Sequence, residues 1–197
     1  YAFIKARVVA GDPQAGADLL ATLKPFVYRK YLDYGAIESI RGMKAMIERE
    51  MARQGMGQNI KLGRGGIREI EFILQTHQLI RGGREPSLQE PNARQVLTAL
   101  KRVGYLDAAD ADRLDAAYVF LRDVEHRLQM ADDRQTQLLP DDERGQQRLA
   151  FACGFPDWPA FLVALDGHRQ NVHEQFSALF RTAPDQPAAD PFVSLWQ

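Results

Sequence analysis

Residues 59–83 read NIKLGRGGIREIEFILQTHQLIRGG, and this stretch decides how the chain folds. Glycines at positions 63, 65 and 66 predict a loop. From Ile67 onward, apolar residues recur three and four positions apart, which is typical of one face of a helix. We therefore predict a helix of about four turns that begins at Ile67 and is closed by Gly82 and Gly83.

The residues just before this loop are where we expect β-structure, at most one short strand near 59–62. Elsewhere the apolar spacing predicts helices joined by short loops, which favours a mainly α fold with antiparallel helices around a shared core. These further helices are predicted over residues 13–24, 28–52, 92–103, 108–131, 142–153 and 157–180. Pro25 is expected to interrupt the first of them.

The composition is that of an ordinary globular protein, with 45% hydrophobic and 26% charged residues in 197. No run of about 18 apolar residues occurs, so no membrane span is predicted. The single cysteine, Cys153, lies among Phe151, Ala152 and Phe155, which favours a buried, inert thiol over a nucleophile. It can form neither an internal disulfide nor a metal site, and a cytoplasmic location is expected.

The net charge of −1 conceals an uneven distribution. Residues 1–68 contain 12 Lys and Arg against 6 Asp and Glu, whereas residues 69–197 contain 13 against 20. One interpretation is that the basic part faces an anion such as a nucleotide. The other is that both parts are solvated helix faces.

The glycine loop also carries the residues best suited to contact phosphate. Gly65 and Gly66 allow close backbone approach, and a helix that starts beside them directs free amides into the loop. Lys61, Arg64 and Arg68 add three cations within eight residues. The loop has neither the Walker ending nor the G-x-G-x-x-G spacing. The alternative is a turn that merely joins a strand to a helix.

Two carboxylates follow on the predicted helix. Glu71 falls on a polar stripe with Arg68, Gln75 and Gln78, whereas Glu69 sits beside apolar neighbours. Glu71 is therefore the candidate for orienting a loop arginine or for a metal's outer shell. An ordinary surface pair between Arg68 and Glu71 is the alternative.

The remaining polar residues favour structural roles. His77 lies on the apolar face and is more typical of a packed core histidine than of a base. The other histidines, His126, His168 and His173, lack partners at metal-ligand spacing. The pairs Asp132-Asp133 and Asp141-Asp142 fit helix capping better than two-metal catalysis. No metal ligand is assigned in this chain.

Several stretches together resemble one enzyme family. They are Ile4-Lys5-Ala6-Arg7, Gly11-Asp12, residues 25–33, residues 59–72, residues 78–89, residues 118–122 and residues 135–140. With these the chain resembles the glutamine synthetase adenylyltransferase / adenylyl-removing enzymes over almost its whole length. The block Gly65 to Arg84 is the most specific part, and its Ile67-Arg68-Glu69 wording is similar to the family's deadenylylating copy.

The resemblance implies that the parent enzyme has two nucleotidyltransferase domains of the polymerase-β type, and that a helical bundle follows each of them. It implies Mg²⁺ and ATP, ADP or phosphate as cofactors of the parent enzyme, with none held tightly by this chain. The family's Gly-Ser-x-x-Asp-x-Asp motif is missing here, since no Gly-Ser dipeptide occurs. The catalytic aspartates are therefore expected upstream of Tyr1, and no catalytic residue is assigned.

The resemblance also predicts the organisation and the partners. Residues 1–84 would be the C-terminal portion of the catalytic domain, residues 85–183 a helical bundle and residues 184–197 a linker. The expected partners are glutamine synthetase, a nitrogen-regulatory signalling protein and the rest of the parent chain, but neither nucleic acid nor membrane. An alternative hypothesis makes the chain a non-catalytic helical module that docks glutamine synthetase or the signalling protein.

Overall fold

A computed structural model describes residues 1–31, 34–52, 56–133 and 135–179. The linker predicted at 184–197 lies outside these residues. The described part is mainly α, as predicted, and contains no strand. Its α-helices are α1 (Pro13–Val27), α2 (Tyr34–Met51), α3 (Ile67–Arg81), α4 (Ala93–Val103), α5 (Ala108–Met130), α6 (Glu143–Ala152) and α7 (Trp158–Ala178). Short 3-10 turns are η1 (Ala2–Lys5), η2 (Met56–Gln58), η3 (Pro86–Leu88) and η4 (Ala131–Asp133).

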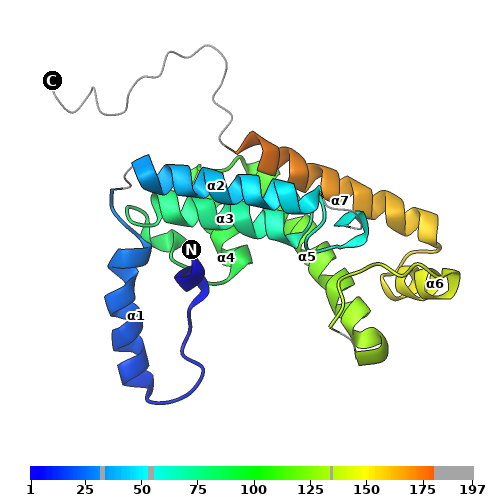
Figure 1. Ribbon diagram of the computed structural model, residues 1–197, viewed down its shortest axis with the longest axis horizontal. Helices are drawn as coiled ribbons and strands as arrows, with labels where there is room; N and C mark the ends of the chain where they lie inside the picture. Colours follow the sequence, from blue (N-terminus) through cyan, green and yellow to red (C-terminus); the bar gives the residue numbers. More distant parts are fainter. Residues whose placement is uncertain (32–33, 53–55, 134, 180–197) are drawn as a thin grey trace, which may run out of the picture.

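Helix α3 is the centre of the molecule (Figure 1). It contacts α2, α4, α5 and α7, whereas α6 packs on α5 and α7 at the end of the molecule opposite α1. Helix α1 contacts η1 and stands apart from the bundle.

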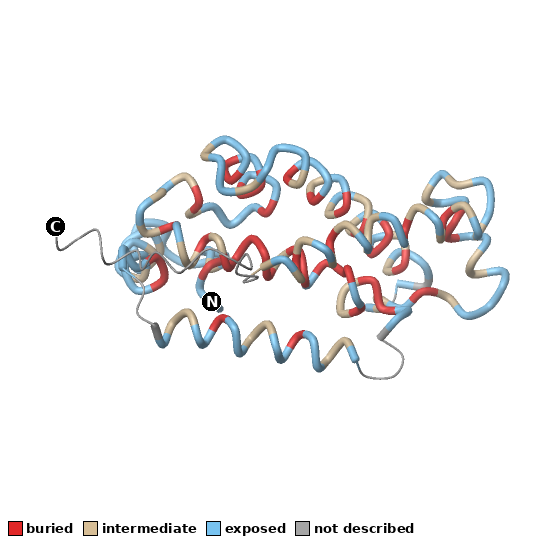
Figure 2. The backbone as a smooth tube through the Cα atoms, turned by 90° about the horizontal axis from the view of Figure 1, so that it is seen from above, coloured by how far each residue is buried: buried red, intermediate tan, exposed pale blue. Residues whose placement is uncertain are grey.

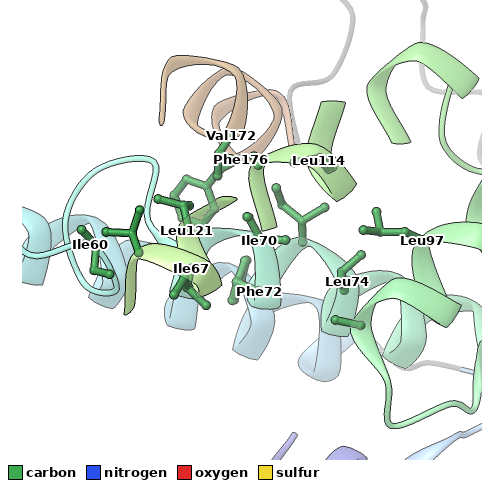
Figure 3. Close-up of a cluster of buried hydrophobic side chains, with 14 of the residues drawn as sticks. Ile60, Ile67, Ile70, Phe72, Leu74, Leu97, Leu114, Leu121, Val172 and Phe176 are labelled. Atoms are coloured by element: carbon green, nitrogen blue, oxygen red, sulfur yellow. The ribbon is translucent and has the colours of Figure 1, made fainter. Parts of the chain in front are cut away.

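One hydrophobic core joins the helices from α2 to α7, and its buried positions run through the middle of the molecule (Figure 2). Ile67, Ile70 and Phe72 of α3 meet side chains of α5 and α7 in this core (Figure 3). The rings of Phe72 and Phe176 pack edge to face with centroids 5.6 Å apart. The domain boundary predicted at residue 84 falls inside this continuous core. Whether the parent protein is divided there stays a prediction.

The predicted helix ends are confirmed where a capping side chain fixes them. Asp12, Asn92 and Asp157 each accept hydrogen bonds from backbone amides at the start of α1, α4 and α7. Gly104 ends α4 in the left-handed conformation at φ 73°. Helix α3 runs from Ile67 to Arg81, as the glycine punctuation predicted.

The interruption expected at Pro25 was wrong, because α1 continues to Val27. A proline removes one amide and leaves the carbonyl of Ala21 without its helical partner. Ala21 is exposed, so water can bind that carbonyl. The start of α2 was also misplaced, since the helix begins at Tyr34 and not near Tyr28.

The strand expected near residues 59–62 is reduced to one isolated antiparallel bridge between Asn59 and Leu138. The Asn59 side chain explains the difference. Its Oδ1 accepts hydrogen bonds from the amides of Lys61 and Leu62, at 2.9 and 2.8 Å. These two local bonds turn the chain directly after Asn59, so the backbone pairing with Leu138 cannot extend into a strand.

His77, a residue of α3, is half-buried, and burial lowers its pKa from 6.5 to about 4. Since the folded state binds the proton less readily than the unfolded chain, this group stabilises the fold above pH 6.5. The stabilisation is lost as the pH falls from 6.5 to about 4. In His77→Phe, we expect the free energy of unfolding to lose about 3 kcal/mol of its change between pH 7 and pH 4. Urea unfolding of both proteins at pH 4 and 7 measures it; equal pH dependence would contradict it.

Within the described residues, the helices are all too short or too polar to span a membrane.

Candidate functional site

The glycine loop is packed against α7. Gly65 adopts φ 68°, and a Cβ there would lie 2.1 Å from the backbone oxygen of Arg169. A Cβ on Gly66 would lie 2.7 Å from the carbonyl of Lys61 and 2.8 Å from that of Gly63. Both glycines are buried, so the space that their missing side chains leave is filled by this chain's own backbone.

The amides at the start of α3 have acceptors inside the protein. Gly65 donates to Glu69 Oε1 at 3.0 Å, and Gly66 donates to the Gly63 carbonyl at 2.9 Å. Ile67 and Arg68 donate to the carbonyls of Ile60 and Lys61, at 3.2 and 3.0 Å. Phosphate contact by Gly65 and Gly66 stays a prediction, but it would compete with these bonds.

The three predicted cations lie in different surroundings. Lys61 Nζ lies 3.7 Å from the buried carboxylate of Glu125. Arg64 opens onto a cleft of about 450 Å³ beside α7, and Arg68 onto a cleft of about 350 Å³ beside α2. The structure thus brings none of the three onto a common ligand position.

The two arginine clefts differ in charge. The Arg64 cleft is lined by Arg169 but also by the carboxylates of Asp166 and Glu174. The Arg68 cleft is lined by Arg49 and Glu50, which leaves a net positive charge. Phosphate is therefore better accommodated beside Arg68.

Glu71 is the centre of a charge node that joins three parts of the chain. Its Oε1 accepts hydrogen bonds from Lys5 Nζ at 2.7 Å and from Arg122 Nη2 at 2.8 Å. Arg122 Nη1 also donates to Glu125 Oε2 at 2.6 Å, and Glu125 pairs with Lys61. Glu71 therefore orients Lys5 and Arg122. Its predicted role in orienting a loop arginine stays a prediction.

Burial disfavours the charged form of Arg122, but hydrogen bonds to Glu125 and Tyr118 outweigh it and raise the Arg122 pKa. The aromatic ring of Tyr118 lies 5.2 Å from its guanidinium carbon. The guanidinium thus stays charged and fixed between α3 and α5. The sequence pattern missed this residue as part of the site, because its partner Glu71 lies on α3, 51 residues away along the chain.

The polar stripe assigned to α3 was partly wrong. Gln75 and Gln78 are buried, at 7% and 2% exposure. Gln78 Nε2 donates to the carbonyls of Leu88 and Glu90, at 2.7 and 2.8 Å. This face therefore packs on the segment after α3 and is unavailable to solvent.

Glu69 lies in a second polar cluster that sequence reasoning missed. It is fully buried, and burial raises its pKa against the opposing effects of the Gly65 amide and His173. His173 Nδ1 lies 3.2 Å from Glu69 Oε1, and His173 Nε2 lies 3.1 Å from Ser177 Oγ. Arg169 donates to the carbonyls of Gly57 and Asn59. These bonds hold α3 and the segment just before the glycine loop against α7.

The other expectations concern single residues. The Cys153 thiol is half-buried, and burial raises its pKa, in line with an inert thiol. Over the ranges that the structure describes, no three His, Cys, Asp or Glu side chains gather where they could hold a metal ion. Asp142 caps α6 through the Gly145 amide, as expected.

The sequence is similar to that of known proteins. The family of the GlnD PII-uridylyltransferases matches residues 41–180, and the chain belongs to this family. The matched segment includes α3, the glycine loop and all of α4 to α7.

Three curated relatives of this chain are enzymes of one kind. Bifunctional glutamine synthetase adenylyltransferase/adenylyl-removing enzymes match this chain from end to end or nearly so. The one from Nitrosococcus oceani is 58% identical over 96% of the chain, and that from Hahella chejuensis 51% over all of it. The one from Pseudomonas putida is 55% identical over 98% of the chain. The chain spans about 20% of the length of each of these relatives.

Proposed function

We propose that this chain is part of an enzyme that attaches AMP to glutamine synthetase and removes it, and that it comes from the deadenylylating half. Its identity to enzymes of that name over almost its full length carries the proposal. The family match supports the same chemistry, since a uridylyltransferase is also a nucleotidyltransferase. The Ile67-Arg68-Glu69 wording supports the deadenylylating half.

In this proposal the chain forms a rigid wall beside the nucleotide and performs no chemistry alone. Mg²⁺ would hold and polarise the phosphates in the parent enzyme. The arginines here suit phosphate, but the described residues offer no carboxylate cluster for the metal. The metal ligands then belong to other parts of the parent protein. Cytoplasmic location and a nitrogen-regulatory signalling partner remain parts of this proposal.

Arg68 is the residue that we place nearest the phosphate. It is exposed, and it lies three residues before Glu71, so both occupy one side of α3. It faces Arg49 across the more positive of the two clefts. The charge node fixes this side of α3 against Lys5 and Arg122. Arg64, with two carboxylates beside it, is the poorer candidate.

We expect Arg68→Ala in the parent enzyme to slow deadenylylation of glutamine synthetase about tenfold or more, since a charged phosphate contact is lost. Adenylylation should change little. Phosphorolytic release of AMP from adenylylated glutamine synthetase, measured with Mg²⁺ and phosphate, provides the test.

Arg102→Ala, an exposed arginine on α4, is the matched control, and Arg64→Ala should resemble it. Unchanged deadenylylation by Arg68→Ala would remove the nucleotide role from α3. In a second arm, the isolated 197-residue chain should neither add nor remove AMP. Turnover by that chain would overturn the placement of the catalytic carboxylates elsewhere.

The alternative role, a docking module without chemistry, applies best to α4–α7. These helices form most of the bundle and lie in the acidic part of the chain. A docking module would lose both activities together when the surface of α4–α7 changes, whereas Arg68→Ala on α3 should slow deadenylylation alone.

A further inference from the structure

A cleft of about 690 Å³ is lined by residues of α5 and α6. Helix α6 lies at the end of the molecule opposite α1 (Figure 1). The end of α5, residues 136–142 and one side of α6 line the cleft. Its volume lies in the range of about 300–1,000 Å³ that small-molecule sites occupy. Neither the proposed deadenylylation nor the loop cations involve this cleft.

One edge of the cleft is basic. Arg144 and Arg148 lie one turn apart on α6, and Arg127 reaches the same cleft from α5. Arg127 is fixed by hydrogen bonds from Nε to the Ala152 carbonyl at 2.5 Å and from Nη1 to the Asp123 carbonyl at 3.1 Å. Among the described residues, Arg144 and Arg148 have neither a hydrogen bond nor an ion pair. Two cations thus stand available to an anion.

Two carboxylates also line the cleft. The Asp142 carboxylate caps α6, accepting a hydrogen bond from the Gly145 amide at 2.8 Å. Asp141 has no such bond among the described residues, and it can accept hydrogen bonds from hydroxyl groups. Three arginines against two carboxylates leave the lining positive. The charges favour a ligand that carries both phosphate and hydroxyl groups.

The rest of the lining is apolar. Leu128 and Leu149 are buried below it, whereas Leu138 and Met130 are exposed by 52% and 81%. A flexible, exposed methionine can cover a flat apolar group, because its thioether adapts to the shape that it meets. The cleft therefore joins an apolar surface to an arginine pair, which matches a ligand with a flat ring at one end and phosphate at the other.

We propose that this cleft binds a nucleoside phosphate, with the phosphates on Arg144 and Arg148, the sugar hydroxyls on Asp141 and the base on Met130. An arginine pair suits phosphate because its planar donors match the phosphate oxygens. The site is distinct from the α3 wall, so it serves as a second nucleotide position on the same protein. An acidic peptide fits less well, since Asp141 would repel it.

The test is calorimetric titration of the 197-residue chain with ADP, pyrophosphate and adenosine. We expect ADP to bind with a Kd below about 1 mM and more tightly than either partial ligand. Arg144→Ala and Arg148→Ala should each weaken ADP and pyrophosphate about tenfold. Met130→Ala should weaken ADP and leave pyrophosphate unchanged.

The controls separate this site from general charge attraction. Arg102→Ala on α4 should bind ADP like the original chain. The methyl NMR signal of Met130 should shift, while that of Met43, which lines neither this cleft nor the Arg68 cleft, does not. Circular dichroism confirms that each variant is folded. Absent ADP binding, equal loss in Arg102→Ala, or equally tight binding of a glutamate heptapeptide would overturn the proposal. None of these results depends on deadenylylation.

Discussion

Replacing Gly65 with alanine is expected to lower the free energy of unfolding by about 3 kcal/mol. Two causes add. An alanine at φ 68° adopts a conformation that costs about 1 kcal/mol or more for an L residue. Its Cβ would also lie 2.1 Å from the Arg169 backbone oxygen, so α7 or the loop must move. Urea unfolding followed by circular dichroism measures the loss.

Gly104→Ala separates the two causes. Gly104 has nearly the same backbone angle, φ 73°, but a Cβ there meets nothing within 4 Å. We expect this variant to lose only about 1 kcal/mol, from the backbone conformation alone. If both variants lost the same amount, the contact between the glycine loop and α7 would have no energetic weight.

Arg122→Met is the second substitution with a large expected effect, a loss of about 3 kcal/mol. It leaves two carboxylates, Glu71 and the buried Glu125, without their shared partner. Glu125 is only 4% exposed, so water cannot replace the guanidinium there. Lys61 remains 3.7 Å away, which keeps the loss near the lower end of the range for a broken buried pair.

Arg94→Met is the matched control, because Arg94 also pairs in a two-bonded geometry with a carboxylate, Asp115 of α5. That pair lies at the surface, and its loss should be a small fraction of the loss in Arg122→Met. Thermal unfolding of both proteins decides the matter. Similar losses would show that the node is an ordinary set of surface pairs.

The node also links stability to the proposed role. Lys5, Glu71 and Arg122 come from η1, α3 and α5, so one carboxylate joins the amino-terminal segment to the bundle. Arg68 projects from α3 just before this joint. A variant that loosens the node should therefore affect both unfolding and deadenylylation, whereas Arg68→Ala should affect deadenylylation alone.

Much of the fold could be predicted because the signals for it are local. Apolar spacing defined α3, Asn92 and Asp157 marked the starts of α4 and α7, and Gly104 marked the end of α4. Each depends on side chains and backbone groups within a few residues. The short strand near 59–62 did not form, and the cause is again local. The Asn59 side chain accepts hydrogen bonds from the next amides and turns the chain.

The candidate site could be predicted only as a set of residues. The sequence by itself determined that glycines at 65 and 66 precede a helix at Ile67, and that cations and carboxylates gather there. Tertiary structure decided what each of them contacts. Glu71 finds Lys5 66 residues away and Arg122 51 residues away, and α7 closes over Gly65. Periodicity encodes which face of a helix a residue occupies, but its partners come from elements that only packing brings together.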